Sequence, residues 1–90
     1  MKFHDARARA LFTLRRLYQR FGTQGQGQHC IDLRLTHQQI ADMIGTLREP
    51  ATLVLKGLQD QKIIDIHHQK ITVLDPGYLM DYSEVDYGEP

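Results

Sequence analysis

Two charged side chains at the start of a leucine-rich segment are the residues best suited to chemistry in this chain. Arg48 and Glu49 lie within "GTLREPATLVLKG", residues 45–57, where leucines and a valine are spaced to face a core. An arginine can donate two hydrogen bonds to guanine O6 and N7, and a glutamate can accept one from cytosine N4. The segment therefore has side chains that could read base edges, provided that the surrounding elements hold both at one surface.

The remaining reactive side chains form no pattern typical of an enzyme or a metal site. His67 and His68 are adjacent, and adjacent residues of a strand point to opposite faces, so the pair cannot chelate one ion well. His29 and Cys30 match no known spacing of metal ligands. No nucleophile, base and carboxylate follow one another at a spacing that stands out from chance. The glycine-rich stretch at 22–27 lacks the lysine of a phosphate loop. We therefore expect no enzymatic activity, no catalytic or metal-binding residue and no cofactor.

The charges are segregated, although the 90 residues have a net charge of zero. Residues 1–74 carry all 11 basic side chains against six acidic ones, a net charge of +5, and residues 75–90 carry the other five acids. A basic body suits a nucleic-acid partner, but a solvated surface with an acidic tail explains the charges equally well. The tail could also cover the basic face or bind a partner.

Length and composition indicate one small domain. No apolar run approaches the roughly 18 residues of a membrane helix, and the N-terminal residues lack a signal-peptide pattern. The single cysteine excludes an intramolecular disulfide. We expect a cytoplasmic protein with no membrane partner.

Hydrophobic periodicity predicts a helix from Asp5 to about Phe21, with Asp5 as its N-cap. "GTQGQGQ", residues 22–28, should end this helix as a flexible loop. "CIDLRL", residues 30–35, alternates apolar and polar residues and predicts a short strand. "THQQIADMIG", residues 36–45, predicts a helix that opens with a capping box between Thr36 and Gln39 and stops at Gly45.

A second helical pattern runs from about residue 48 to 61. Its inward residues are Ala51, Val54, Leu55 and Leu58. "KIIDIH" (62–67) and "KITVLD" (70–75) then predict a hairpin, because only His68 and Gln69 separate them. Residues 75–77, Asp-Pro-Gly, should end the last strand, and residues 77–90 are expected to form an acidic, flexible tail.

Pro50 restricts where the second motif helix can begin. If Thr46 were the cap, Pro50 would stand at the fourth helical position and could not donate the first backbone hydrogen bond. At the third or first position its missing N–H costs little. We therefore predict that the helix begins at Leu47 or later, without a capping box from Thr46 to Glu49.

The predicted order is helix, strand, helix, tight turn, helix and hairpin. Two short helices around a glycine turn form a helix-turn-helix, and the following hairpin makes it winged. The fold class is therefore α+β, with about three helices, a short N-terminal strand and a C-terminal β-hairpin wing. The domain should span residues 1–76.

"LTHQQIADMIGTLRE" and "VLKGLQDQKIIDIHHQKITV" resemble the DNA-binding domain of the catabolite-activator and fumarate–nitrate-reductase (CRP/FNR) regulators. Within that superfamily they are most similar to the cyanobacterial nitrogen-control regulators. The resemblance covers about residues 5–75. It implies sequence-specific binding of double-stranded DNA, with the second motif helix in the major groove and the wing on the backbone.

The resemblance also implies roles for individual positions. Arg48 and Glu49 match the base-reading pair, residues 36–38 match a phosphate-contacting helix start, and residues 68–70 match the wing tip. The candidate DNA-binding residues are Thr36, His37, Gln38, Thr46, Arg48, Glu49, Thr52, Lys56, His68, Gln69 and Lys70.

Three departures from the residue pattern of the superfamily support an alternative function. Leu47 replaces a usual serine or threonine, Leu53 replaces a frequent arginine, and the wing tip is less basic than in close relatives. These changes would suit a degenerate winged helix that acts as a protein–protein interaction module. The ligand-binding β-roll and long dimerisation helix of the superfamily are also absent, so the chain is either an excised domain or a naturally short protein. We expect a monomer or weak homodimer, with RNA polymerase or a missing effector and dimerisation domain as further candidate partners.

Overall fold

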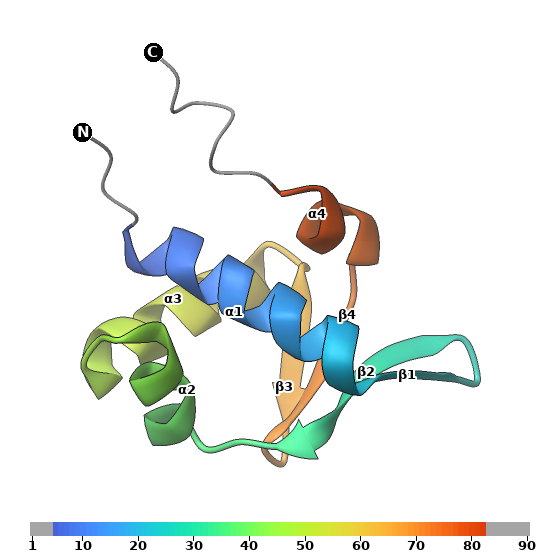
Figure 1. Cartoon of the computed structure of the whole chain (residues 1–90), viewed down its shortest axis with the longest axis horizontal. Helices are drawn as coiled ribbons and strands as arrows, with labels where there is room; N and C mark the ends of the chain where they lie inside the picture. Colours follow the sequence, from blue (N-terminus) through green and yellow to red (C-terminus); the bar gives the residue numbers. More distant parts are fainter. Residues whose placement is uncertain (1–4, 83–90) are drawn as a thin grey trace.

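A computed structural model describes residues 5–82. Within this range the elements are, in chain order, α1 (Ala6–Phe21), β1 (Gly22–Gly25), β2 (Gln28–Arg34), α2 (His37–Ile44), α3 (Arg48–Asp60), β3 (Ile64–His67), β4 (Lys70–Val73) and α4 (Pro76–Asp81). The strands form one antiparallel sheet in the order β1-β2-β4-β3. In Figure 1, α1 crosses one face of the sheet, and α2 and α3 lie beside α1. The predicted α+β winged helix-turn-helix is confirmed.

One hydrophobic core joins the helices to the sheet. The helices contribute buried leucines and isoleucines at the spacing that the periodicity predicted, and the strands contribute alternate residues. Its central side chains are Leu11, Leu14, Ile31, Ile40, Leu55, Leu58, Ile64, Ile71, Val73 and Leu79. The predicted cap of α1 is also present, since an Asp5 carboxylate oxygen accepts from the Ala8 N–H at 2.8 Å.

Residues 22–28 do not form the expected flexible loop. Gly22 to Gly25 pair with β2, and a two-residue turn at Gln26 and Gly27 connects the strands. Both turn residues have positive φ, 54° and 80°, as a tight hairpin turn of the primed type requires. All four β1 residues are exposed, so no alternation of apolar residues marked this strand. Its backbone pairing with β2 defines it instead.

Residues 76–81 also differ from the expectation of a tail that is flexible from residue 77. They form α4, which Asp75 caps by accepting from the Tyr78 N–H at 3.0 Å. Leu79 is completely buried in the common core, and an Arg15 N–H donates to the Tyr82 carbonyl at 2.6 Å. The packed domain therefore extends past the predicted boundary at residue 76. Residues 83–90 of the predicted tail lie outside the described residues.

The start of α2 carries the predicted capping box. The Thr36 hydroxyl accepts from the Gln39 N–H at 3.0 Å, and the Gln39 side-chain oxygen accepts from the Thr36 N–H at 2.8 Å. Two N–H groups that the helix cannot satisfy are thereby paired. This arrangement positions the first turn of α2 on the surface.

We expect Thr36→Ala to lower the free energy of unfolding by about 0.5–2 kcal/mol, because it removes the hydroxyl that accepts from Gln39. Urea titration followed by circular dichroism measures this change. Thr36→Ser is the control, since serine keeps the acceptor. Equal stability of the alanine and serine variants would show that the capping box contributes nothing.

Candidate nucleic-acid interface

The turn between α2 and α3 has the geometry of a helix-turn-helix. Gly45 adopts a left-handed conformation, with φ 83° and ψ 37°, and its N–H donates to the Ala41 carbonyl at 2.9 Å. The Thr46 N–H donates to the same carbonyl at 3.0 Å. A residue with a Cβ would resist the conformation of Gly45. Ala41 has a small side chain that is completely buried, so α3 can approach α2 closely.

Helix α3 begins as Pro50 predicted. Leu47 is the N-cap without a side-chain hydrogen bond, and its carbonyl accepts from the Ala51 N–H at 3.2 Å. Pro50 thus occupies the third helical position, where an N–H has no partner within the helix. Arg48 and Glu49 stand in the first turn, and both are exposed. The carboxylate of Glu49 is also favourably placed at the positive end of the helix dipole.

Side chains from three elements meet at one open recess, here called the α2–wing recess. Its lining comes from the start of α2, the start of α3 and the turn between β3 and β4. The lining residues are Thr36, His37, Gln38, Arg48 and Gln69. Five candidate residues from three separate segments of the chain therefore share one surface.

A second open recess, here called the α3 recess, lies on the exposed side of α3. It is lined by Arg48, Glu49, Thr52 and Leu53. Arg48 lines both recesses, so they adjoin at this residue. His37 Nδ1 hydrogen-bonds to the Thr52 hydroxyl at 3.2 Å and fixes the start of α2 against α3.

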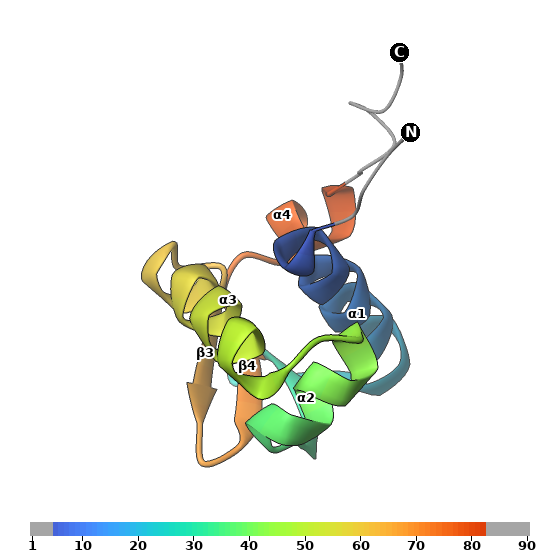
Figure 2. The same cartoon turned by 90° about the vertical axis from the view of Figure 1, so that its left-hand side faces the viewer.

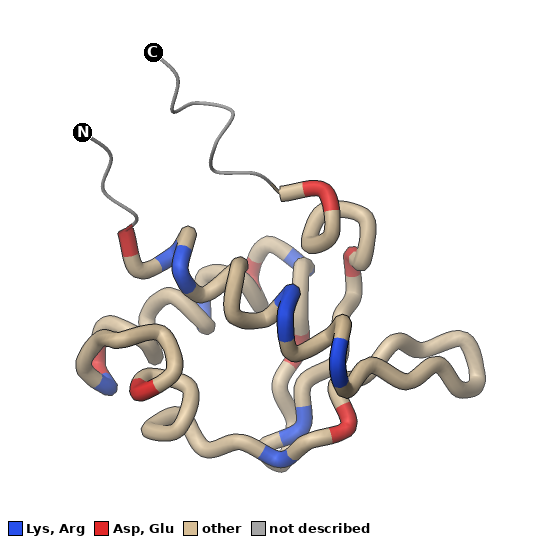
Figure 3. Tube along the Cα trace, viewed as in Figure 1, with Lys and Arg blue, Asp and Glu red and all other residues tan. Residues whose placement is uncertain are grey.

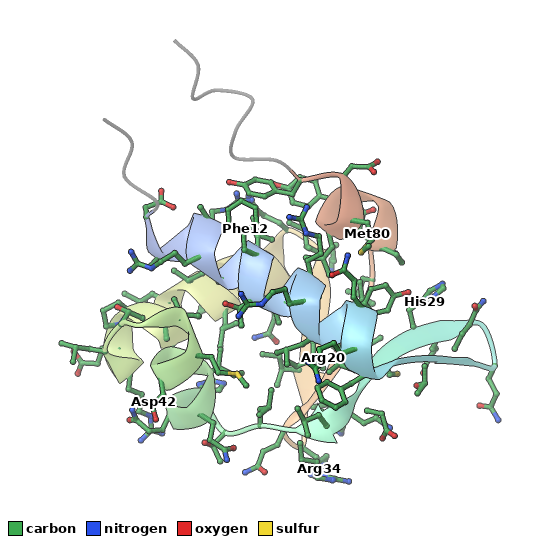
Figure 4. The ribbon with its side chains drawn as sticks, in the orientation of Figure 1. Phe12, Arg20, His29, Arg34, Asp42 and Met80 are labelled. Atoms are coloured by element: carbon green, nitrogen blue, oxygen red, sulfur yellow. The ribbon has the colours of Figure 1, made fainter. Side chains whose placement is uncertain are left out.

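The wing is a tight hairpin whose tip is tied to the end of β2. His68 and Gln69 both have positive φ, 52° and 66°, so the two-residue turn is again of the primed type. An Arg34 N–H donates to the His68 carbonyl at 2.7 Å, and the Leu35 N–H donates to the Gln69 carbonyl at 3.0 Å. Figure 4 shows Arg34 at the lower edge of the molecule. These bonds hold the wing tip next to the segment that leads into α2.

The family model for the Crp-like helix-turn-helix domain matches residues 8–82. The chain belongs to this family. Crp-like domains of this kind are the DNA-binding domains of CRP/FNR transcription regulators, so the match favours DNA binding over a protein-interaction module.

Among curated proteins, the domain is 43% identical over 56 residues to the global nitrogen regulator of Synechococcus elongatus, an alignment that covers 62% of this chain and 25% of the relative. It is 50% identical over 46 residues to the global nitrogen regulator of Nostoc sp., which covers 51% of this chain and 21% of the relative. The aligned residues thus span about a quarter of the length of these relatives.

Solved structures share the fold. A CRP/FNR-family transcriptional regulator from Thermus thermophilus has a TM-score of 0.74 at 26% identity, covering 84% of this chain and 39% of that one. Oxidised CprK in complex with o-chlorophenolacetic acid has a TM-score of 0.77 at 22% identity, covering 97% and 38%. At that identity the second similarity concerns the fold alone.

The other candidate residues of this Crp-like domain do not line either recess. Lys70 and His68 are exposed at the wing tip. Thr46 is half-buried in the turn and Lys56 is exposed further along α3, and neither lines a recess. Arg34, in contrast, was not among the sequence candidates. Its position just before the capping box was the only local signal, since its contact with the wing is formed by residues far along the chain.

The described part of the Crp-like domain contains no group of three or more His, Cys, Asp or Glu side chains that could hold a metal ion. The rings of His67 and His68 make an edge contact, with 4.1 Å between their centroids. They do not point to opposite faces as expected, because β3 ends at His67 and His68 belongs to the turn. Of the helices within residues 5–82, none is both long and apolar enough to cross a membrane.

Proposed function

We propose that this Crp-like domain binds a specific sequence of double-stranded DNA, with α3 in the major groove and the wing against the backbone. The observation that carries the proposal is the convergence of the first turn of α2, the first turn of α3 and the wing tip at the α2–wing recess. These three elements can then contact one stretch of duplex together. The start of α2 and the wing tip can supply phosphate contacts, which set the position of the protein on the duplex, while α3 supplies base contacts.

The distribution of charge supports the same orientation. Arg34, Arg48 and Lys70 are exposed around the recesses and the wing. The acids of α4 and its cap, Asp75 and Asp81, lie at the opposite end of the molecule from the wing tip (Figures 2 and 3). A polyanion that approaches this surface would meet Arg34, Arg48 and Lys70, with Glu49 as the acid that lines the α3 recess. Asp42 adds a negative charge on α2. Its carboxylate accepts a hydrogen bond from the Gln38 side chain at 2.9 Å.

Each candidate contact has a definite chemical partner in this proposal. Arg48 donates two hydrogen bonds to a guanine, and Glu49 accepts one from a cytosine. The N–H groups and side chains at the start of α2, at residues 36–38, bind a phosphate. Thr46 in the turn and Thr52 and Lys56 along α3 add contacts, and residues 68–70 contact the backbone beside the groove.

We further propose that the domain acts together with a partner domain that supplies effector binding and dimerisation. The relatives that it matches are longer than this chain, and the alignments cover only 25% and 21% of their length. Regulators with this motif bind two half-sites about one helical turn apart as dimers. The described chain alone is expected to be a monomer or weak homodimer that binds one half-site weakly. RNA polymerase is a further candidate partner of the assembled regulator.

The salt dependence of DNA binding tests the proposal. The logarithm of the binding constant should fall linearly with the logarithm of salt concentration, with a slope of about −0.9 for each neutralised phosphate. Lys70→Ala should weaken binding to all sequences and reduce the slope by about 1. Arg20→Ala, which removes an exposed charge on α1 outside the two recesses, is the control. Binding that is independent of salt, or equal slopes for all three proteins, would contradict the proposed DNA surface.

A further inference from the structure

Two leucines beside the base-reading pair are unusually exposed. Leu47 is 76% exposed and Leu53 is 70% exposed. The other exposed large apolar side chains among the described residues range from 37% to 48%. Placing two leucines almost fully in water loses the free energy that burial would provide. Leu47 caps α3 and Leu53 lies in its second turn, so a ligand bound against this part of α3 would cover at least one of them.

Leu53 stands where α3 would meet a ligand in the groove. It follows Glu49 by one helical turn and precedes Lys56 by three residues, so the three share the exposed face of the helix. It also lines the α3 recess together with Arg48, Glu49 and Thr52. Leu47 lines neither recess and caps the helix. Leu53 is therefore the leucine that a molecule bound against Arg48 would contact.

The surroundings of Leu53 suit a small apolar group rather than an apolar protein surface. Leu47 and Leu53 are six positions apart, which separates them by about 120° around the helix axis at about 100° per residue. They do not form the contiguous apolar patch typical of a protein-docking site. Leu53 is an isolated apolar contact framed by the polar side chains of Arg48, Glu49 and Thr52.

We propose that Leu53 is a specificity-determining residue that packs against the C5-methyl group of a thymine. This inference rests on the proposed function. In the major groove, thymine is the base that presents a methyl group, and apolar side chains recognise it by contact. Leu53 lies five residues beyond Arg48, about 7.5 Å along the helix axis. This distance is about two base-pair steps of 3.4 Å. The preferred site should therefore hold a thymine within about two base pairs of the guanine bound by Arg48.

Replacing thymine by deoxyuridine tests the contact, because it removes one methyl group and leaves the hydrogen-bonding edge unchanged. A duplex is first selected with the full 90-residue chain from a random-sequence pool. Each thymine of that duplex is then replaced in turn, and the affinity is measured by fluorescence anisotropy at one salt concentration. At one position the substitution should weaken binding by the unaltered protein about four-fold, the effect of one buried methyl group.

Leu53→Ala should bind the thymine duplex more weakly and should not respond to deoxyuridine at that position. Leu74→Ala is the matched control, since Leu74 is 48% exposed but follows β4 near α4, away from both recesses (Figure 1). It should keep the four-fold discrimination. Because Leu53 is exposed, its alanine variant should melt at the same temperature as the unaltered protein, which circular dichroism verifies.

Three results would overturn the inference. One is a selected duplex in which no thymine responds to deoxyuridine, and another is equal discrimination by Leu53→Ala and the unaltered protein. The third is a change in self-association on Leu53→Ala, measured by sedimentation, without any change in DNA discrimination. That result would assign Leu53 to a protein contact. The salt dependence separates these failures from a failure of the proposed function, since a protein that binds duplex DNA with the expected slope but ignores the methyl group refutes only the role of Leu53.

Discussion

Arg48→Ala is expected to weaken binding to the selected duplex by roughly 5- to 150-fold, which corresponds to about 1–3 kcal/mol. Arg48 is exposed in the first turn of α3 and lines both recesses, so it is accessible to a base of a bound duplex. Removing it leaves the two guanine acceptors without a protein donor. The preference at one base pair should relax, while the other positions of the site keep theirs.

Fluorescence anisotropy with duplexes altered at single positions measures this effect at constant salt. Arg48→Lys keeps the positive charge but loses the planar pair of donors. It should therefore recover part of the affinity without recovering the preference for guanine. Arg16→Ala, which removes an exposed arginine of α1, controls for net charge. If Arg48→Ala and Arg16→Ala lower the affinity equally, Arg48 contributes only charge and the assignment of base reading is wrong.

Leu79→Ala is expected to lower the free energy of unfolding by about 2–5 kcal/mol. This loss is a large part of the roughly 5–15 kcal/mol that stabilises a typical domain. Leu79 is completely buried and is the one buried residue of α4. It packs into the same cluster as Leu14 of α1 and Val73 of β4, so alanine would leave a cavity where several elements meet.

Urea unfolding followed by circular dichroism measures the loss. Met80→Ala is the neighbouring control, because Met80 is 37% exposed and its truncation should change stability little. A chain that ends at Asp75 should lose at least as much stability as Leu79→Ala, since it lacks α4 altogether. Equal unfolding midpoints for Leu79→Ala and Met80→Ala would mean that α4 does not belong to the folded core.

The helix-turn-helix could be predicted from the sequence because its determinants are local. The capping box of Thr36 and Gln39 spans four residues, and both of its hydrogen bonds are present. Gly45 supplies the left-handed turn without help from distant contacts. Pro50 lacks an N–H, and this property alone restricted where α3 could begin.

The wing could be predicted for a similar reason, although its turn residues are not the usual ones. Only two residues separate the paired segments, and a two-residue connection imposes a tight turn with positive φ. His68 and Gln69 adopt that conformation, which asparagine and glycine adopt more readily. Pairing of β3 with β4, in the register Ile66 to Ile71, stabilises the turn.

Two elements depended on tertiary contacts that no local pattern announced. β1 consists of exposed glycine, threonine and glutamine, and only its pairing with β2 makes it a strand. Helix α4 has six residues, too few for a helix to be stable alone. The contacts of Leu79 with the core and of Tyr82 with Phe12 and Arg15 hold it in place.

By itself, the sequence determined which residues could read a base, where each motif helix begins and ends, and how the wing turns, because each depends on bonds between near neighbours. Only the tertiary structure decided which of those residues share a surface. Arg34 reaches the carbonyl of His68 across 34 positions of the chain, and Thr36 and Gln69 line one recess. Such proximity depends on how the core packs the sheet against the helices, and a local pattern does not contain that information.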